Sequence, residues 1–316
     1  MTARRIGAGL LALALLGLAG CSSGGDGSDT EESEATSSAG PRRTGTPDPD
    51  EDKEDPTDPS GPSESSGPSG SADSPAPDAT RPASRRWRPR PGTRWQWQLD
   101  GRVDMSVDVP VYDIDGFENS AKTVEGLHAR GRKVICYINA GAWEKFRPDQ
   151  AAFPKELLGE NNGWAGERWL DIRRLDVLRP LMAARIDMCR KKGFDAVEPD
   201  LTEGYRNTTG FPLTAAHQLA FNRMLAELAH DRGLAVGLKN DLDQIPELVG
   251  DFDFAVNEEC AQFGECDRLT PFVKRDKAVF HVEYALAPDA FCRDAERLGL
   301  SSMRKRLDLD SWRKPC

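Results

Sequence analysis

Short runs rich in β-forming residues alternate with amphipathic helical patterns over roughly the last 230 residues, and this alternation limits the folds available to the chain. Eight runs are typical of strands, at 94–99, 109–113, 133–139, 194–198, 234–239, 252–258, 278–284 and 299–303. Six stretches are typical of helices, at 118–130, 176–192, 213–232, 241–249, 262–275 and 288–298. Repeated strand–helix units favour a parallel sheet, and eight strands predict a single α/β domain with a (β/α)8 TIM-type barrel.

Local sequence features bear on this prediction. Gly131, Gly193 and Gly233 stand just before predicted strands, where helix C-caps prefer glycine. The competing fold, a doubly wound open sheet, needs a glycine-rich phosphate loop after its first strand, and neither GxGxxG nor GxxxxGK[ST] occurs. The connection 140–193 is long enough to hold extra structure over the active face of the barrel.

The segment 22–84 contains no Val, Ile, Leu, Met, Phe, Trp or Tyr. It holds ten prolines, with 15 Asp and Glu against 4 Lys and Arg. Such a composition cannot bury enough apolar surface to offset the entropy of ordering, so we expect a disordered spacer. A specific acidic ligand for a basic partner is the alternative interpretation.

The first residues resemble the signal of a bacterial lipoprotein. Arg4 and Arg5 precede an apolar run over 6–19, which is too short to cross a bilayer comfortably, and the run leads to Leu-Ala-Gly-Cys at 18–21. We therefore expect a signal peptide at 1–20, a lipidated Cys21 with an acidic linker at 21–86, and one domain at 87–316. The expected location is the outer face of the cytoplasmic membrane, with the domain extracellular; an ordinary secreted protein is the alternative.

The charge and the histidine count exclude several functions. The formal net charge is −10, but residues 85–316 carry 37 acidic and 36 basic residues and are nearly neutral, which argues against nucleic-acid binding through a basic face. The chain has only four histidines and no HExxH motif or paired metal-binding spacing. We expect no metal, no redox or nucleotide cofactor, and a monomer.

Carboxylates dominate the residues where the predicted strands end. In a barrel the strand ends converge on one face, where the reactive groups lie. Five of the eight ends carry acidic residues: Asp113, Asp115, Glu198, Asp200, Asp241, Glu258, Glu259 and Glu283. For Asp115 and Asp241 we favour helix N-capping, because each precedes a predicted helix.

A pair of carboxylates suits glycoside hydrolysis, which needs one protonated acid and one ionised nucleophile or base. Crowded acids also raise one another's pKa, so that one stays protonated near neutral pH. A surplus of carboxylates indicates a cationic substrate, such as an amino-sugar polymer.

Seven sequence blocks together resemble glycoside hydrolase family 114. The blocks are WQWQL at 95–99, VYDID at 111–115, VICYINAG at 134–141, WLDIR at 169–173, FDAVEPD at 194–200, GLKN at 237–240 and NEEC at 257–260. The resemblance implies a (β/α)8 barrel with endo-α-1,4-polygalactosaminidase activity on galactosamine-containing polymers.

The resemblance assigns the two catalytic carboxylates to Asp200 and Glu258. The family usually has Gln after that glutamate, where this chain has Glu259. Since strand alternation puts neighbouring side chains on opposite faces, we expect only Glu258 to point into the cleft. We expect a retaining mechanism with Asp200 as nucleophile and Glu258 as acid/base, although the roles can be exchanged.

Further side chains are candidates for substrate contacts. They are Asp113, Asn139, Asp171, Lys239, Trp97 and Tyr205. Glu198 is instead a candidate for a buried partner that sets the pKa of Asp200. Each tryptophan or tyrosine is more often a core residue than a sugar platform.

Six cysteines remain after Cys21, and an even number in an exported domain indicates disulfides. They allow 15 connectivities. We favour Cys260–Cys266, which closes a small loop after Glu258, then Cys292–Cys316, with Cys136–Cys189 left by elimination.

Two rival functions use the same cleft. One is a non-catalytic cell-surface protein that binds a glycan, and the other is a hydrolase of a different wall or capsule polysaccharide. The presence of both Asp200 and Glu258 favours an enzyme, because a binding protein does not need that pair.

Overall fold

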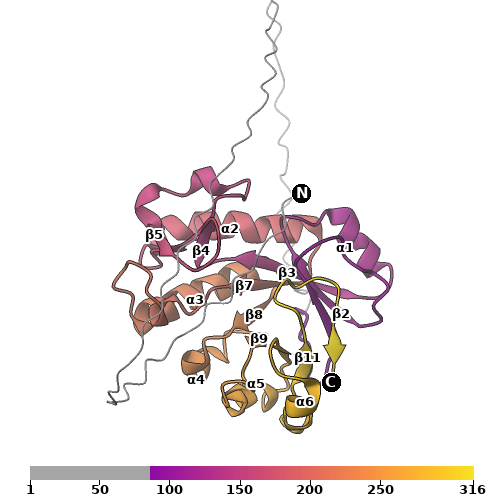
Figure 1. Cartoon of the computed structure of the whole chain (residues 1–316). Helices are drawn as coiled ribbons and strands as arrows, with labels where there is room; N and C mark the ends of the chain where they lie inside the picture. The colour runs from indigo at the N-terminus through magenta and orange to yellow at the C-terminus, as the bar shows by residue number, and fades with distance from the viewer. Residues whose placement is uncertain (1–85) are drawn as a thin grey trace, which may run out of the picture. The chain divides into compact units, whose positions relative to one another are not determined.

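Eight parallel strands form the centre of the fold, and each lies beside its neighbour in chain order (Figure 1). They are β1 (Trp95–Gln98), β2 (Val111–Asp115), β3 (Lys133–Asn139), β7 (Ala196–Asp200), β8 (Ala235–Lys239), β9 (Phe254–Glu258), β10 (Val279–Glu283) and β11 (Ser301–Arg304). The sheet curls, as a TIM-type barrel requires, and all eight predicted strands overlap observed ones.

The computed structural model describes residues 86–316 as one mixed α/β domain. The predicted signal peptide, Cys21 and almost all of the predicted linker lie outside these residues. Within 86–316 no helix combines the length and the apolar character that a membrane span needs.

The helices surround the sheet in chain order (Figure 1). They are α1 (Ala121–His128), α2 (Leu175–Lys192), α3 (Ala215–His230), α4 (Ile245–Leu248), α5 (Thr270–Val273) and α6 (Pro288–Arg297). The two predicted helices at 241–249 and 262–275 are broken into short pieces, because the 3-10 turns η4 (Leu242–Gln244) and η5 (Cys266–Leu269) precede α4 and α5.

The helix ends follow from local chemistry. Ser120 caps α1 through its side-chain oxygen, which accepts the N–H of Thr123 at 3.2 Å. Gly193 ends α2 in the left-handed conformation, with φ of 90°, as its position before a strand predicts.

The connection between β3 and α2 forms a small domain insert. It holds an antiparallel sheet in the order β4-β6-β5, made of β4 (Ala142–Glu144), β5 (Leu158–Asn161) and β6 (Glu167–Leu170), with the 3-10 turns η1 (Gln150–Ala152) and η2 (Lys155–Leu157). The sequence predicts added structure in this connection, but not its strands.

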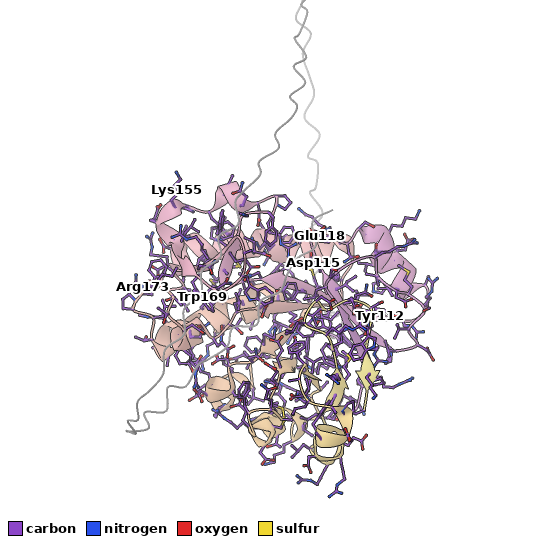
Figure 2. All side chains as sticks on the ribbon, in the orientation of Figure 1. Tyr112, Asp115, Glu118, Lys155, Trp169 and Arg173 are labelled. Carbon is purple, nitrogen blue, oxygen red and sulfur yellow. A yellow bond between two sulfur atoms is a disulfide. The ribbon has the colours of Figure 1, made fainter. Side chains whose placement is uncertain are left out.

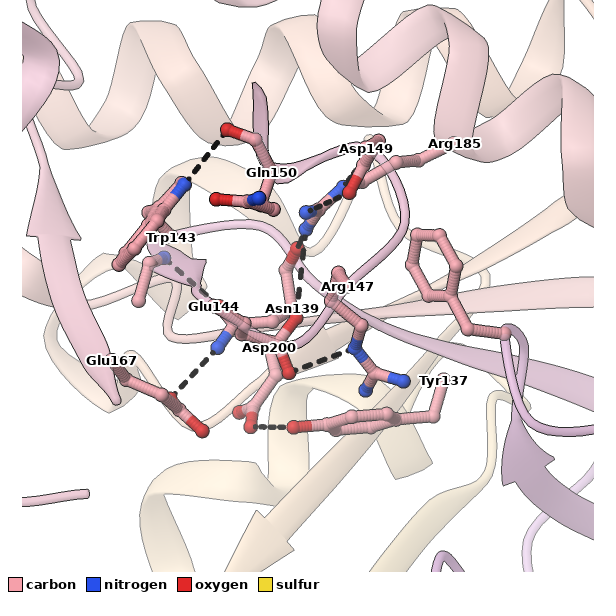
Figure 3. A network of polar contacts seen from close by, with 12 residues as sticks. Tyr137, Asn139, Trp143, Glu144, Arg147, Asp149, Gln150, Glu167, Arg185 and Asp200 are labelled. Carbon is pink, nitrogen blue, oxygen red and sulfur yellow. Dashed lines mark hydrogen bonds and ion pairs between the residues drawn. The ribbon is translucent and has the colours of Figure 1, made fainter. Parts of the chain in front are cut away.

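A buried ion network fastens the insert to the barrel. The Arg147 guanidinium lies 2.6 Å from Asp115 Oδ2 and 3.0 Å from Glu144 Oε1, and all three side chains are buried. Arg185 of α2 donates from Nη1 to the carbonyl of Asn139 at 2.5 Å and pairs with Asp149 at 2.7 Å. The end of β3, the insert and α2 are therefore one connected unit (Figure 3).

The C-terminal segment bridges the two edge strands, β1 and β11. The carbonyl of Leu309 accepts the N–H of Leu99 at 3.0 Å, and Arg313 donates to the carbonyl of Trp95 at 3.0 Å. On the other side β12 (Lys314–Pro315) pairs antiparallel with β11. β12 is too short for a sequence pattern to predict.

All three favoured disulfides are present. Cys136–Cys189 joins β3 to α2, Cys260–Cys266 closes the loop after β9, and Cys292–Cys316 ties the C-terminus to α6. The last bond fixes the segment that bridges the edge strands.

We predict that Arg147→Met destabilises the domain by about 3–5 kcal/mol, because it leaves the buried carboxylate of Asp115 without its cation and removes the nearer cation of Glu144, with Arg185 remaining 3.8 Å from that group. Urea unfolding followed by circular dichroism measures this change. The control is Arg174→Met, which removes an exposed pair with Asp176 and should cost less than about 1 kcal/mol. Equal effects of the two changes would contradict a structural role for the buried network.

Candidate active site at the carboxyl ends of the strands

Strand alternation gives the barrel an apolar floor and a polar rim. Residues at the same parity along each strand form one buried interior cluster that includes Val111, Ile135, Ala196, Ala235, Phe254 and Phe280. Two or four residues further along, the same faces carry Asp113, Tyr137, Asn139, Glu198, Asp200, Lys239, Glu258 and Tyr284. We call these eight residues the rim.

Lys239 is the centre of the rim. Its ammonium nitrogen lies 2.8 Å from Asp200 Oδ1, 3.0 Å from Glu258 Oε2 and 3.6 Å from Glu198 Oε1. It also lies 4.9 Å from the centre of the Trp97 ring. Burial favours loss of its proton, but the surrounding carboxylates outweigh burial and raise the pKa of Lys239 well above its usual range.

Three donors hold the Asp200 carboxylate. Besides Lys239, the Tyr137 hydroxyl donates to Oδ2 at 2.7 Å and the N–H of Leu201 donates to Oδ1 at 2.8 Å (Figure 3). Burial raises the pKa of Asp200, but Lys239 and these hydrogen bonds outweigh it and lower the pKa below its ordinary value. Asp200 is therefore ionised, and its side chain keeps 17% exposure.

Glu258 is held at the opposite side of Lys239. The Tyr284 hydroxyl donates to Oε1, and Asn240 Nδ2 donates to Oε2 at 3.3 Å. Its side chain is 26% exposed. Since Asp200 Oδ1 and Glu258 Oε2 contact the same nitrogen at 2.8 and 3.0 Å, these two oxygens are at most about 5.8 Å apart.

Asp113 and Glu198 form a second carboxyl pair, without solvent exposure. Burial and the neighbouring Glu198 raise the pKa of Asp113 well above its ordinary value. Burial raises the pKa of Glu198 to about 7, against the opposing effect of Lys239. Because the pKa of Asp113 is raised furthest, with Glu198 beside it, we interpret Asp113 as the protonated partner.

The other predicted substrate contacts lie in different surroundings. Asn139 is 2% exposed, and its Nδ2 donates to Glu167 of the insert at 3.2 Å (Figure 3). Asp171 pairs with Arg173 at 2.7 Å, and this hydrogen bond lowers its pKa. Trp97 is fully buried beneath Lys239, whereas Tyr205 of η3 (Gly204–Arg206) is partly exposed.

Figure 2 labels Trp169 and Arg173, which lie two residues before and two after Asp171 in the chain. It also labels Asp115, the last residue of β2, and Glu118 just beyond it. Asp171 follows β6 and belongs to the insert rather than to a barrel strand. The structure brings together Asp113, Asp200, Lys239, Trp97 and Glu258, with Asn139 on the same rim, whereas Asp171 pairs with Arg173.

N-capping by Asp115 and Asp241 is wrong. Ser120 caps α1, while Asp115 accepts the N–H groups of Phe117 and Glu118 and binds Arg147. Asp241 precedes η4, but its side chain makes no capping hydrogen bond and instead accepts from Asn222 at 2.9 Å. Asp115 thus makes a local turn and a tertiary ion pair, and Asp241 has a tertiary partner, but neither caps a helix.

The sequence patterns did not predict a functional role for three residues that bond to Asp200 or Glu258: Tyr137, Tyr284 and Asn240. Tyr137 and Tyr284 fall at the inward parity of their strands, and that period of two is a signal which identifies them in the sequence. Asn240 has no such signal, because its orientation depends on a φ of +48° just after β8.

The prediction that Glu258 rather than Glu259 points into the cleft rests on strand alternation, which does not extend to Glu259. β9 ends at Glu258, and Glu259 has a φ of +62°, so strand alternation no longer applies to it. Glu259 and Tyr284 line the same hollow, of about 520 Å³. A second hollow, of about 590 Å³, lies over the insert and includes Glu167.

Cys260, Cys266 and His281 place their potential ligand atoms within 4.8 Å of one another. The disulfide uses both sulfurs, and His281 bonds to Ser302 and Glu283 at 2.8 Å each. These residues are thus bonded to one another and to their neighbours rather than arranged as a set of free ligands.

Comparisons with known proteins give a matching family model and similar solved structures. A family model described as glycoside-hydrolase family GH114 matches residues 76–316. Ega3 of Aspergillus fumigatus, solved in complex with galactosamine, is 40% identical, with a TM-score of 0.70 over 74% of this chain and 98% of Ega3. A comparison with curated protein sequences gives no match.

A more distant structure has the same fold. The glycoside hydrolase domain of PelA from Pseudomonas aeruginosa is 13% identical, with a TM-score of 0.57 over 70% of this chain and 98% of that domain.

We predict that Asp113→Asn becomes more stable relative to wild type as pH rises above about 4. An acid whose pKa is raised by folding keeps its proton in the folded state while the unfolded chain releases it, so rising pH destabilises the wild-type fold until Asp113 ionises. Asparagine cannot release this proton. Urea unfolding of both proteins at pH 5 and pH 8 measures the difference.

The control is Asp108→Asn, an exposed carboxylate paired with Arg132, whose pKa this hydrogen bond lowers. The stability of this control relative to wild type should not rise between pH 5 and pH 8, unlike that of Asp113→Asn. A stability difference for Asp113→Asn that is independent of pH would show that Asp113 is ionised in the fold.

Proposed function

Because the chain belongs to glycoside hydrolase family GH114, we propose that it cleaves α-1,4-linked galactosamine-containing polysaccharide with Asp200 and Glu258 as its two catalytic carboxylates. The chain is a glycoside hydrolase similar to endo-α-1,4-polygalactosaminidases. The observation that carries the assignment is the position of both carboxylates on one ammonium, Lys239, at the exposed edge of the rim.

The carboxylate separation supports a retaining mechanism. Retaining enzymes place their two carboxyl groups about 5–5.5 Å apart, whereas inverting enzymes leave about 6.5–9.5 Å for a water molecule. The upper bound of about 5.8 Å between Asp200 Oδ1 and Glu258 Oε2, the oxygens that share Lys239, is nearer to the first class than to the second.

The surroundings assign the two roles. Asp200, with three donors and a lowered pKa, is the nucleophile that attacks the anomeric carbon. Glu258 reacts in its protonated form and gives this proton to the departing glycosidic oxygen as the covalent glycosyl–Asp200 ester forms. Glu258 then removes a proton from the water that hydrolyses the ester, which restores both groups.

Lys239 and the buried acid pair act on the nucleophile. Once Asp200 has formed the ester it carries no charge, and Lys239 then keeps Glu258 and Glu198 as counter-charges.

The substrate is an amino-sugar polymer, which the surplus of carboxylates at the rim attracts. The complex of Ega3 with galactosamine supports this substrate class.

The domain acts as a monomeric (β/α)8 barrel outside the cell. A diacylglyceryl group on Cys21 would anchor it to the outer face of the cytoplasmic membrane, with the acidic linker as a tether.

The test of this function is cleavage of galactosamine polymers of known acetylation by the soluble domain. We predict that Asp200→Asn and Glu258→Gln each reduce turnover by at least about 10³-fold, because each removes a group that reacts in the transition state. Oligosaccharide release followed by mass spectrometry measures turnover, and proton NMR of fresh products should show α reducing ends before β.

Asp176→Asn, on the exposed surface of α2, serves as the control and should keep full activity. Near-wild-type turnover in either active-site variant would remove that residue from the mechanism. Binding of polymer without release would support a glycan-binding protein instead.

We predict that Tyr137→Phe shifts the acidic limb of the pH–activity profile by roughly 0.5–1 unit to higher pH. The lost hydrogen bond stabilises the ionised form of Asp200, so its loss raises the pKa of the nucleophile, and activity disappears at a higher pH on acidification. The measurement is kcat/KM between pH 3 and pH 8.

Tyr112→Phe is the matched control, because the Tyr112 hydroxyl donates at 2.6 Å to the carbonyl of Val107, away from the rim. Its acidic limb should coincide with that of wild type. A shift of equal size in both variants would assign the effect to general loosening of the fold.

A further inference from the structure

A hollow beside Glu258 has the features of a sugar subsite. Its volume is about 520 Å³, and the residues lining it are Glu259, Tyr284, Ala285, Arg304, Lys305, Arg306, Leu307 and Trp312. Tyr284 belongs both to this hollow and to the rim, because its hydroxyl donates to Glu258. The hollow therefore adjoins the acid/base rather than the nucleophile.

The walls of the hollow are partly apolar. Leu307 is 39% exposed and Trp312 is partly exposed, so both offer surface to a ligand. An exposed leucine beside a tryptophan and a tyrosine is suited to the apolar face of a pyranose ring.

The cationic groups of the hollow are already engaged within the protein. Arg304 Nε donates to the carbonyl of Tyr284 at 3.1 Å. Arg306 pairs with Asp310 at 3.1 Å and lies 4.9 Å from the Trp312 ring. Lys305 donates to two backbone carbonyls, those of Asp310 and Trp312, at 2.6 Å each.

The Glu259 carboxylate differs from these groups, since within residues 86–316 it makes no hydrogen bond or ion pair. Its backbone is held firmly: its N–H donates to the carbonyl of Val282 at 2.8 Å, and its own carbonyl accepts from Phe263 at 3.1 Å. The Cys260–Cys266 disulfide closes the loop that follows. A non-glycine residue kept at φ of +62° beside a catalytic group is a place where backbone strain serves function.

We propose that this hollow is the leaving-group subsite and that Glu259 binds the ammonium group of a galactosamine unit there. The inference rests on the proposed function, because it assumes that Glu258 is the acid/base. Glu259 is thereby a specificity-determining residue that favours cleavage where the unit on the leaving-group side is deacetylated. The new non-reducing ends of the products then carry free amines.

The electrostatics agree with a cationic ligand. Burial, together with the Glu258 and Glu283 carboxylates, raises the pKa of Glu259 above its ordinary value. An ammonium group bound beside Glu259 offsets that repulsion, whereas a neutral N-acetyl group cannot.

The experiment compares wild type, Glu259→Gln and Glu259→Asp on fully deacetylated and on highly N-acetylated galactosamine polymer. With Glu259→Gln we expect KM for the deacetylated polymer to rise about tenfold at similar kcat, and KM for the acetylated polymer to change less than twofold. Glu259→Asp keeps the charge and should recover part of the preference.

Product sequences give a second readout. On a partly acetylated polymer, tandem mass spectrometry should show wild-type products with galactosamine enriched at the new non-reducing ends, and Glu259→Gln products without that enrichment. The control is Glu265→Gln, in the same disulfide loop but outside the hollow, where the ion pair with Arg268 at 3.7 Å is lost. It should match wild type on both polymers.

Equal changes in KM on the two polymers would overturn the role of Glu259. So would wild-type products whose new non-reducing ends are randomly acetylated. In both cases cleavage of the polymer still upholds the proposed function. Failure of wild type to cleave any galactosamine polymer would overturn both. Circular dichroism and disulfide mapping of Glu259→Gln establish that any loss comes from the site rather than from misfolding.

Discussion

A buried ammonium group organises the interior of this barrel. Lys239 lies within 3.6 Å of three carboxylates, and two of them, Asp200 and Glu258, reach the solvent. Without this cation, three acids in so small and dry a space would have to take up protons or move apart. The cation thus holds Asp200 and Glu258 close together and favours the ionised form of Asp200.

Two buried acids and two tyrosines complete the surroundings of Lys239 and its carboxylates. Asp113 and Glu198 form a buried pair of acids, with Glu198 3.6 Å from the Lys239 ammonium. Tyr137 donates its hydroxyl to Asp200, and Tyr284 donates its hydroxyl to Glu258. These contacts come from strands well separated in the chain, so the site depends on the curvature of the whole sheet.

The insert, the disulfide loop and the C-terminal segment form the surroundings of Asp200 and Glu258. The insert is fastened by the Arg147 network, and Glu167 on it contacts Asn139 at the end of β3. On the other side, the Cys260–Cys266 disulfide closes the loop after Glu258, and the C-terminal segment bridges the edge strands. The insert lines one hollow, and the C-terminal segment lines most of the other. The two hollows beside the rim therefore differ in the side chains that they present.

The sequence alone predicted the eight strands, their parallel order and the carboxylates at the strand ends, because alternation and glycine caps are local signals. It favoured the observed disulfides but left their connectivity open. It did not reveal the antiparallel sheet of the insert, β12, or the partners of Asp115 and Asp241, which depend on residues far away in the chain. Only the tertiary structure placed Lys239 between Asp200 and Glu258 and brought Glu259 and Tyr284 to the same hollow. The reason is physical: a period of two says which side a strand residue faces, whereas distances between strands and a positive φ at a strand end are set by packing.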